Sequence, residues 1–360
     1  MEKEMIEKKQ EEFKFIKQVR INGFWKSENS SISWILNPDV NILAGDNGTG
    51  KSTVLQLIIG TIRQEFKRPF LCDLYNIIGI SFNDFLPEKV TASKWNVFSS
   101  LSNEQTLEFI SKDERFNDKF KIFIQEKAKK GVFISKNNIH LPDIHNNKKL
   151  PRIRIDEIKT VDSLLLDRET IQKLSNEEVL TDLDWKVSKL EIEYKDYQID
   201  IGKRTINALK KGEKTDKVTK ISETQTLFYD LIDQLFAHTK KTIDRESNDI
   251  LFRDKENKEI TPYRLSSGEK HMLIMLLTAL VQDNKHAIMI MDEPEISLHT
   301  DWQKNLISNI RKLNPNVQLI IATHSPAIVM NGWQDKIFQI DDLIVKSEAN
   351  KIEEINQESN

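Results

Sequence analysis

The sequence has few of the features that build disulfide-linked, zinc-bound or membrane-spanning folds. Its 360 residues contain a single cysteine, Cys72, which excludes an intramolecular disulfide and a cysteine-based zinc site and fits a reducing compartment. Neither sign of charge dominates, with 53 Lys and Arg against 56 Asp and Glu, so net charge predicts no polyanionic partner. The longest apolar run, Met272 to Val281, is too short to span a bilayer. We therefore expect a soluble, cytoplasmic protein with no membrane partner.

Glycine is also scarce, yet three of the 11 glycines fall within the stretch GDNGTGKS. This stretch matches G-x-x-x-x-G-K-[ST] and lies between an apolar strand, VNILA, and a helical segment, KSTVLQLIIGTIRQEF. Such a loop can turn successive backbone N–H groups toward phosphates, and the helix N-terminus that follows adds its positive dipole end. Lys51 is expected on the β- and γ-phosphates of ATP and Ser52 on Mg²⁺. The predicted nucleotide-binding residues here are Gly45, Asp46, Asn47, Gly48, Thr49, Gly50, Lys51, Ser52 and Thr53.

Three carboxylates follow a second apolar strand in the stretch HAIMIMDEPE. Asp292, at the strand end, is a candidate Mg²⁺ ligand, usually through water, and Glu293 is the candidate base that polarises the attacking water. Pro294 stops the strand. Glu295 has three open interpretations: a hydrogen bond within the turn, a solvated side chain, or a direct role.

Two further motifs end or begin apolar segments. RLSSGEK starts a long apolar helix, where the serines are either ordinary N-caps or part of an anion site. IIATHSP ends another apolar strand on His324, which is either structural or placed to contact a γ-phosphate. The candidate anion-binding residues of the first motif, called the signature from here on, are Ser266, Ser267, Gly268 and Glu269.

The coarse pattern predicts an α/β fold. Short, continuously apolar strands alternate with helices at both ends of the chain, which indicates one mostly parallel sheet shared by the two ends. Between them, apolar residues from Leu180 to Ile201 repeat at spacings of three and four, as along the seam of a coiled coil. With a second segment around Ile221 to Leu235 they predict a helical hairpin. The alternative is an ordinary pair of helices packed on the core.

Taken together, the phosphate loop, LSSGE, IMIMDEPE, SLH and ATHSP follow the order found in ABC-type ATPases. The residues in these motifs resemble those of the RecF/SMC/OLD-like branch, and most of all those of the small AAA-family ATPases of bacterial antiphage defence. The resemblance implies an ABC-type ATPase head, a P-loop NTPase fold, with a mainly helical insertion that includes a short coiled-coil-like hairpin. It also implies ATP held between two heads, with Ser297 and His299 at the partner subunit and His324 sensing the γ-phosphate. Asn83 and Asp84 stand where the family has a glutamine, so a Q-loop contact is in doubt.

The predicted domain limits follow from the same motifs. Residues 1–95 and 246–345 form the two parts of the ATPase head, and residues 346–360 a flexible tail. Residues 96–245 form the inserted lobe, with the hairpin at about 176–240.

Three functions compete. The leading hypothesis is an ATPase in antiphage defence that forms an ATP-sandwiched dimer or higher homo-oligomer and controls a separately encoded effector such as a nuclease. The rival is a DNA-binding repair or recombination protein, favoured by seven Lys or Arg residues in the stretch 203–220, although exposed lysines are more often simply solvated. A transporter subunit is disfavoured by the long insertion.

Overall fold

The computed structural model describes residues 14–24, 30–63, 77–82, 91–94, 153–159 and 179–346. The chain divides into two compact units. The first comprises residues 1–38, 44–153 and 338–360, and the second residues 39–43 and 154–337. None of the helices in the described ranges combines the length and apolar character that a bilayer crossing needs.

The first unit contains an antiparallel sheet in the order β13-β2-β1-β4-β5. Its strands are β1 (Ile16–Asn22), β2 (Ser30–Ile35), β4 (Ile77–Phe82), β5 (Thr91–Lys94) and β13 (Ile344–Lys346). In β2, Ile32 and Trp34 are buried while Ser33 and Ile35 are exposed, as expected when one sheet face is covered. The helix α2 (Lys51–Arg63) packs against β4 and β5, and α11 (Ile340–Leu343) against β2.

The second sheet has the order β12-β3-β11-β10-β6. Its strands are β3 (Val40–Ala44), β6 (Arg154–Lys159), β10 (Ala287–Asp292), β11 (Val317–Ala322) and β12 (Ile337–Gln339). The pairs β3–β11, β11–β10 and β10–β6 are parallel, and every residue of β11 is buried. In this register Leu43 lies opposite Ala322, and Ala322 opposite Asp292.

The expected parallel sheet shared by the two ends of the chain is present, because β3 pairs with β11, but it does not include β1 and β2. The two earliest strands pair antiparallel in a separate sheet, and only β3 joins the parallel one. The burial patterns give the reason. β2 alternates between buried and exposed residues, whereas the first four residues of β3 are all buried, as a strand covered on both faces requires.

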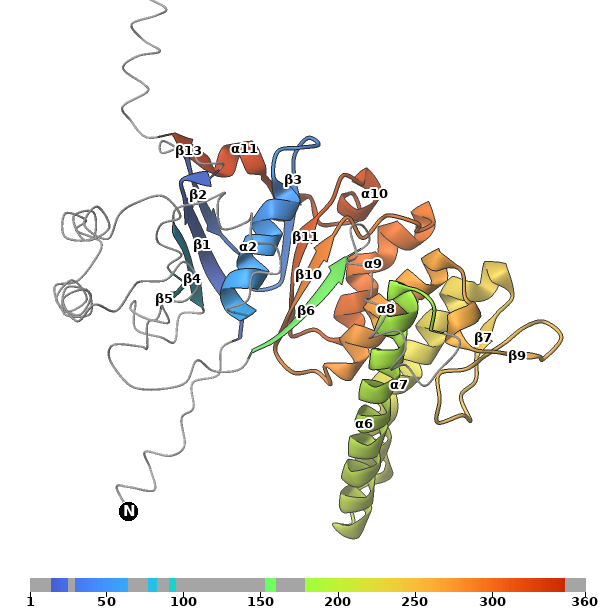
Figure 1. Cartoon of the computed structure of the whole chain (residues 1–360). Helices are drawn as coiled ribbons and strands as arrows, with labels where there is room; N and C mark the ends of the chain where they lie inside the picture. Colours follow the sequence, from blue (N-terminus) through green and yellow to red (C-terminus); the bar gives the residue numbers. More distant parts are fainter. Residues whose placement is uncertain are drawn as a thin grey trace, which may run out of the picture. The chain divides into compact units, whose positions relative to one another are not determined.

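Helices of the second unit surround one central helix, α8 (Ser267–Val281) (Figure 1). Nearly all of its side chains are buried, and it contacts α6 (Asp182–Lys210), α7 (Thr215–Phe236) and α9 (Thr300–Leu313). A helix that is apolar all round is expected at such a central position. Smaller elements complete the unit: β7 (Thr242–Ile243), β8 (Phe252–Arg253), β9 (Glu259–Ile260), α10 (Pro326–Val329), and 3₁₀ turns at Ala237–Thr239, Pro262–Arg264 and Gln334–Lys336.

The predicted helical hairpin is present as α6 and α7, which lie side by side (Figure 1). The hydroxyls of Tyr194 and Tyr229 are 2.5 Å apart, and Gln225 donates to both. The seam residues from Val187 to Ile201 belong to the same apolar core as α8, and α6 contacts α8 as well as α7. This arrangement fits a helix pair packed on the core, and a coiled-coil insertion is not confirmed. The predicted domain limits stay predictions, since most of residues 96–175 and the tail lies outside the described residues.

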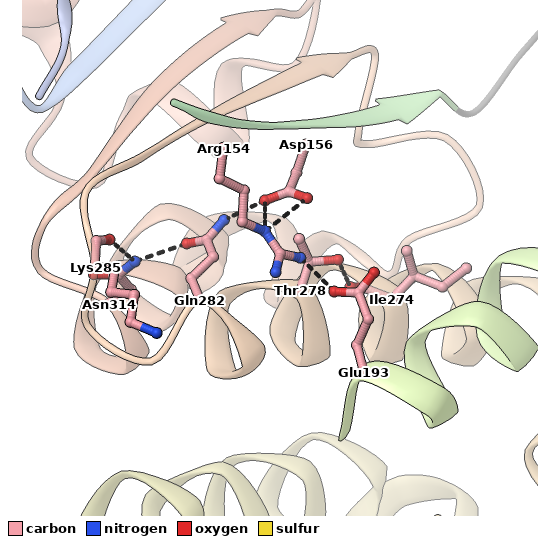
Figure 2. Close-up of polar contacts among 8 residues, drawn as sticks. All are labelled: Arg154, Asp156, Glu193, Ile274, Thr278, Gln282, Lys285 and Asn314. Atoms are coloured by element: carbon pink, nitrogen blue, oxygen red, sulfur yellow. Dashed lines mark hydrogen bonds and ion pairs between the residues drawn. The ribbon is translucent and has the colours of Figure 1, made fainter. Parts of the chain in front are cut away.

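A partly buried polar network lies at the end of the parallel sheet where β6, β10 and β11 begin (Figure 2). Arg154 pairs with Asp156 at 2.8 Å, and Asp156 accepts from Gln282 at the end of α8 at 2.8 Å. The amide oxygen of Gln282 accepts from Asn314 at the end of α9, also at 2.8 Å. The network ties both helix ends to the sheet and fixes the helices that carry the signature and the turn before α9.

Candidate nucleotide-binding site

The loop predicted to hold phosphate begins immediately after β3 and ends at the first residue of α2. Gly45 has φ of +151° and Gly48 has φ of +82°, a region that side chains with a Cβ rarely adopt. A Cβ on Gly45 would also lie 2.7 Å from Cγ2 of Ile340. Asp46 and Asn47 are exposed at the loop's outer turn, so the loop is open to solvent there.

Lys51 is buried and folds back over this loop. Its Nζ donates to the carbonyl oxygens of Gly45 and Asp46, both at 2.9 Å. The loop therefore holds an ammonium group next to the N-terminus of α2, and both attract anions. The residues present fit the diphosphate group of a nucleotide. Ser52 is exposed beside it and Thr53 is half-buried.

In the second unit, the carboxylate turn follows β10. Glu293 has φ of +49°, an uncommon value for a residue with a side chain, and its N–H donates to the Ala322 carbonyl at 2.8 Å. This bond fastens the turn to the end of the neighbouring strand. Glu293 Oε1 lies 3.7 Å from Nε2 of His324, with both side chains about one-third exposed. Two of the predicted catalytic residues are therefore adjacent.

Glu295 has a definite role in this turn. Its Oε1 accepts from the backbone N–H of His324 at 2.8 Å, and its Oε2 is buried with no hydrogen-bond partner among the described residues. It thus holds the segment that carries His324. Sequence reasoning had left Glu295 open, because nothing local indicates a partner 29 positions away.

The signature segment begins α8 with a capping box. Ser266 is the N-cap, its Oγ accepts from the N–H of Glu269 at 3.3 Å, and the Glu269 carboxylate accepts from the Ser266 N–H at 2.8 Å. Glu269 is buried and also accepts from Lys241 at 2.7 Å and Thr239 at 2.7 Å. Burial by itself raises the pKa of the Glu269 carboxyl, but these hydrogen bonds outweigh it and hold the pKa below its usual value.

Gly268 brings this helix start against the turn before α9. A Cβ at Gly268 would lie 2.2 Å from the carbonyl oxygen of Ser297, so only glycine fits. Ser297 itself has φ of +67° and is exposed. His299 is the N-cap of α9, and its Nδ1 accepts from the Asp301 N–H at 3.4 Å. The start of α8 and the SLH turn are therefore packed against each other, and Ser266, Ser267, Ser297 and His299 are exposed.

A match to a known family decides the class of protein. Residues 40–331 match the family described as "AAA domain, putative AbiEii toxin, Type IV TA system". The chain belongs to this AAA-domain family. The match spans the phosphate loop, the signature, the carboxylate turn and His324, which are the segments from which the AAA-family resemblance was inferred.

Two curated relatives are both named as probable ATPases. The chain is 28% identical over 100 residues to "Retron Vc95 probable ATPase" of Vibrio cholerae serotype O1 biovar El Tor, which is 25% of this chain and 20% of the relative. It is 34% identical over 89 residues to "Retron Ec83 probable ATPase" of Escherichia coli, which is 22% of this chain and 16% of the relative. The matches thus span a fifth or less of either relative's length. Their names agree with the predicted AAA-type ATPase family that the family match shows, whereas the RecF/SMC-like branch stays a prediction.

Solved structures with low similarity include two SMC heads. An Smc head domain with an extended coiled coil, bound to the C-terminal domain of ScpA and derived from Pyrococcus furiosus, has a TM-score of 0.43 at 14% identity, covering 96% of this chain and 99% of that one. The SMC head domain from Thermotoga maritima has a TM-score of 0.39 at 13% identity, covering 88% and 92%. At these TM-scores the likeness supports no inference.

The structure assigns most site residues of this AAA-domain protein to two separate groups. The phosphate loop lies in the first unit, and Asp292, Glu293, His324 and the signature in the second. Glu269 is buried and bonded to Ser266, Lys241 and Thr239, and its predicted nucleotide contact stays a prediction. Asn83 and Asp84 lie outside the described residues.

A cavity of about 480 Å³ in the second unit is a poor alternative nucleotide site. It lies by Arg154 and Asp156, near the start of β6, whereas Asp292 ends the parallel strand β10. Its lining includes five carboxylates and would repel phosphates: Asp156, Glu193, Asp196, Asp200 and Asp283.

Proposed function

We propose that the chain binds and hydrolyses ATP and uses that cycle to control assembly with a separately encoded effector, such as a nuclease, in bacterial antiphage defence. The loop from Gly45 to Ser52, with Lys51 folded into it, is the observation that carries the ATP part. The family description and the two retron relatives support the defence part.

Nucleotide binding is expected to redirect Lys51. Its Nζ exchanges the carbonyl oxygens of Gly45 and Asp46 for β- and γ-phosphate oxygens, while loop N–H groups and the start of α2 face the same phosphates. Ser52 and Asp292 would hold Mg²⁺, whose charge offsets that of the phosphates. A hydroxyl and a carboxylate are oxygen ligands of the kind Mg²⁺ prefers.

Hydrolysis in this proposal depends on Glu293. Its carboxylate accepts a proton from the attacking water, and His324, 3.7 Å away, faces the transferred phosphate. Glu295 fixes the His324 backbone through the 2.8 Å bond to its N–H. The bond from the Glu293 N–H to Ala322 holds this residue in its uncommon positive-φ conformation at the strand end.

The assembly step uses the surface made by the signature and the turn before α9. Ser267 and Gly268 would contact nucleotide bound to a second copy, and Ser297 and His299 would contact that copy itself. The 2.2 Å constraint at Gly268 joins the two motifs, so each is positioned by the other. ATP would then act as the link within a homodimer or larger homo-oligomer, and hydrolysis would release it.

The proposal is tested by substituting the base and the loop lysine separately. Glu293→Gln should bind ATP and lose turnover by at least about a hundredfold, the range of general-base loss. Lys51→Ala should lose nucleotide binding itself. ATP binding is measured by equilibrium dialysis and turnover by phosphate release. Normal turnover in Glu293→Gln would remove Glu293 from the base role.

The effector role has its own test. Co-expression of the chain with the product of the adjacent gene should give a complex whose toxicity depends on an intact Lys51. A neighbourhood with no toxic product, or toxicity unchanged by Lys51→Ala, would contradict control of an effector.

A second function, DNA binding in repair or recombination, is favoured by one observation. All seven basic residues of the hairpin tip are exposed: Lys203, Arg204, Lys210, Lys211, Lys214, Lys217 and Lys220. If they contact phosphates, duplex affinity should fall steeply with salt, and alanine at Lys211, Lys214 and Lys217 should lower that slope by about three. Equal affinity in the wild type and in this variant would reject the DNA function.

A further inference from the structure

The outer face of α6 carries an apolar stripe that no described residue covers. Ile192, Ile199 and Ile206 recur every seven residues and are 63%, 53% and 54% exposed. Leu209, one turn on from Ile206, is 60% exposed. Because the buried seam of the helix runs along Val187, Leu190, Tyr194 and Ile201, this stripe lies on the opposite side.

Large apolar side chains that are exposed to solvent gather on this stripe. Seven large apolar side chains are more than half exposed in the described part of the chain, and four of them lie on this one helix face. Isoleucine also favours helices less than the lysine or glutamate that normally occupies solvent-facing positions. Single exposed apolar residues need no explanation, whereas a contiguous row on one helix is typical of an interaction surface.

A glycine in the middle of this face points the same way. Gly202 lies within α6, three residues after Ile199 and four before Ile206, where a glycine destabilises a helix relative to alanine. A Cβ at Gly202 would meet nothing within 4 Å, so no contact among the described residues requires glycine there. A missing side chain at this point lets a second helix approach closely.

The residues beside the stripe determine the charge of whatever covers it. Positions three or four residues from an isoleucine share its face. Four of these positions are lysines and one is an acid: Lys189, Lys195, Lys203, Lys210 and Asp196. All four lysines are exposed, so the apolar row has a basic border. Two of them already have acidic partners, Lys195 with Asp249 at 2.7 Å and Lys203 with Asp200 at 3.3 Å. Such exposed pairs contribute at most about 1 kcal/mol, so an incoming carboxylate can replace them.

We propose that this face of α6 binds an acidic amphipathic helix of a different protein. Its apolar residues would pack between Ile192, Ile199 and Ile206, its backbone would approach Gly202, and its carboxylates would pair with the flanking lysines. A second copy of α6 fits less well, because an antiparallel pair centred on Ile199 places Lys195 beside Lys203 of the partner subunit. DNA would use the lysines but would leave the isoleucines exposed. The inference requires neither ATP binding nor turnover, so its failure leaves the proposed function standing.

The test uses the full chain and a fluorescent synthetic helix of about four heptads, with leucines at the seam and glutamates at the flanks. The control peptide has lysine in place of every glutamate. The acidic peptide should bind in fluorescence anisotropy, and the basic one should not. Ile199→Glu and Gly202→Trp should each weaken binding at least about tenfold, as expected for the centre of an interface.

Two matched variants distinguish loss of the surface from loss of the fold. Gly202→Ala should fold as the wild type does, because a methyl group there meets nothing within 4 Å among the described residues, and it should weaken binding less than Gly202→Trp, because a methyl group obstructs an approaching helix less than an indole ring. Met330→Glu makes the same chemical change as Ile199→Glu at another exposed apolar residue, and it should leave binding unchanged. Circular dichroism and gel filtration establish that each variant is folded; if Ile199→Glu fails to fold, Gly202→Trp and Gly202→Ala alone decide.

Several results would overturn the proposal. Equal binding of the acidic and basic peptides, or acidic-peptide binding that persists in both Ile199→Glu and Gly202→Trp, would exclude this face. Self-association in sedimentation velocity that is lost in Ile199→Glu would identify a second copy as the occupant. Duplex DNA binding that is lost in Gly202→Trp would identify nucleic acid instead.

Discussion

At the scale of single residues, Gly268 allows the sharpest test. A Cβ at this position would lie 2.2 Å from the carbonyl oxygen of Ser297, so there is no room for any side chain. Because the contact is to backbone, relief would require the start of α8 or the turn before α9 to move. The two motifs proposed to face a second copy would move with them.

Gly268→Ala should therefore lower ATP turnover at least about tenfold while ATP binding to the phosphate loop is kept, since misplacement of a site by about 1 Å has effects of this size or larger. Steady-state phosphate release and equilibrium dialysis measure the two quantities. The matched control is Gly202→Ala, a helical glycine in open space, which should keep full turnover and gain up to about 1 kcal/mol of stability. Unchanged turnover in Gly268→Ala would contradict the contact's importance.

His271, in the middle of the core, predicts a pH dependence of stability. Neither ring nitrogen has a hydrogen-bond partner among the described residues, and burial, helped by Lys186, lowers the pKa of His271 to about 4. Below pH about 6.5, the ordinary pKa of histidine, His271 is protonated in the unfolded chain but stays neutral in the folded chain until the pH approaches 4. The free energy of unfolding should thus fall by about 3 kcal/mol as the pH drops from about 6.5 to 4.

His271→Leu should remove most of that slope, because the replacement is apolar and cannot titrate. Urea unfolding at several pH values between 7 and 4.5 measures it. If wild type and His271→Leu lose stability in parallel over this range, another group is responsible.

At the scale of elements, two buried ion pairs connect α8 to the start of α6 and to the segment that follows α7. Lys270 pairs with Asp184 at the start of α6 at 2.7 Å, and its neighbour Glu269 pairs with Lys241, just beyond α7, at 2.7 Å. The carboxylates are almost fully buried. Two adjacent residues at the start of α8 are thus attached to the two ends of the hairpin.

Removing one partner should cost more than the pair is worth, because it leaves a buried charge behind. Lys241→Met should lower the free energy of unfolding by about 2–3 kcal/mol, discounted for partial exposure of the lysine, and should also reduce turnover. Lys258→Met breaks an exposed pair with Glu256 and should change stability by less than about 1 kcal/mol. Chemical denaturation compares the two, and equal losses would reject the anchoring role of Glu269.

The elements that could be predicted from sequence are those whose pattern is local. The phosphate-loop strand β3, α2, β10 and β11 are continuous apolar runs or follow a glycine motif, so their limits were close to those observed. What could not be predicted depends on distant partners. The Glu269–Lys241 pair, the Glu295 bond to His324 and the separate sheet of β1 and β2 join residues that no periodicity relates. The role of Glu295 stayed open, and β1 and β2 were assigned to the parallel sheet, for this reason.

At the scale of the whole molecule, the central proposal is that ATP pairs two chains. The signature and the SLH turn belong to the second unit and the phosphate loop to the first. In the proposal, ATP bound to the phosphate loop of one chain contacts the signature of another. This claim is distinct from binding or turnover alone.

The mass of Glu293→Gln with and without MgATP, measured by analytical ultracentrifugation, tests this claim most directly. Because the variant should bind ATP without hydrolysing it, the pairing should accumulate. We predict that saturating MgATP at least doubles the mass of Glu293→Gln and leaves that of Lys51→Ala unchanged. A mass of Glu293→Gln that is the same with and without bound ATP would contradict the account.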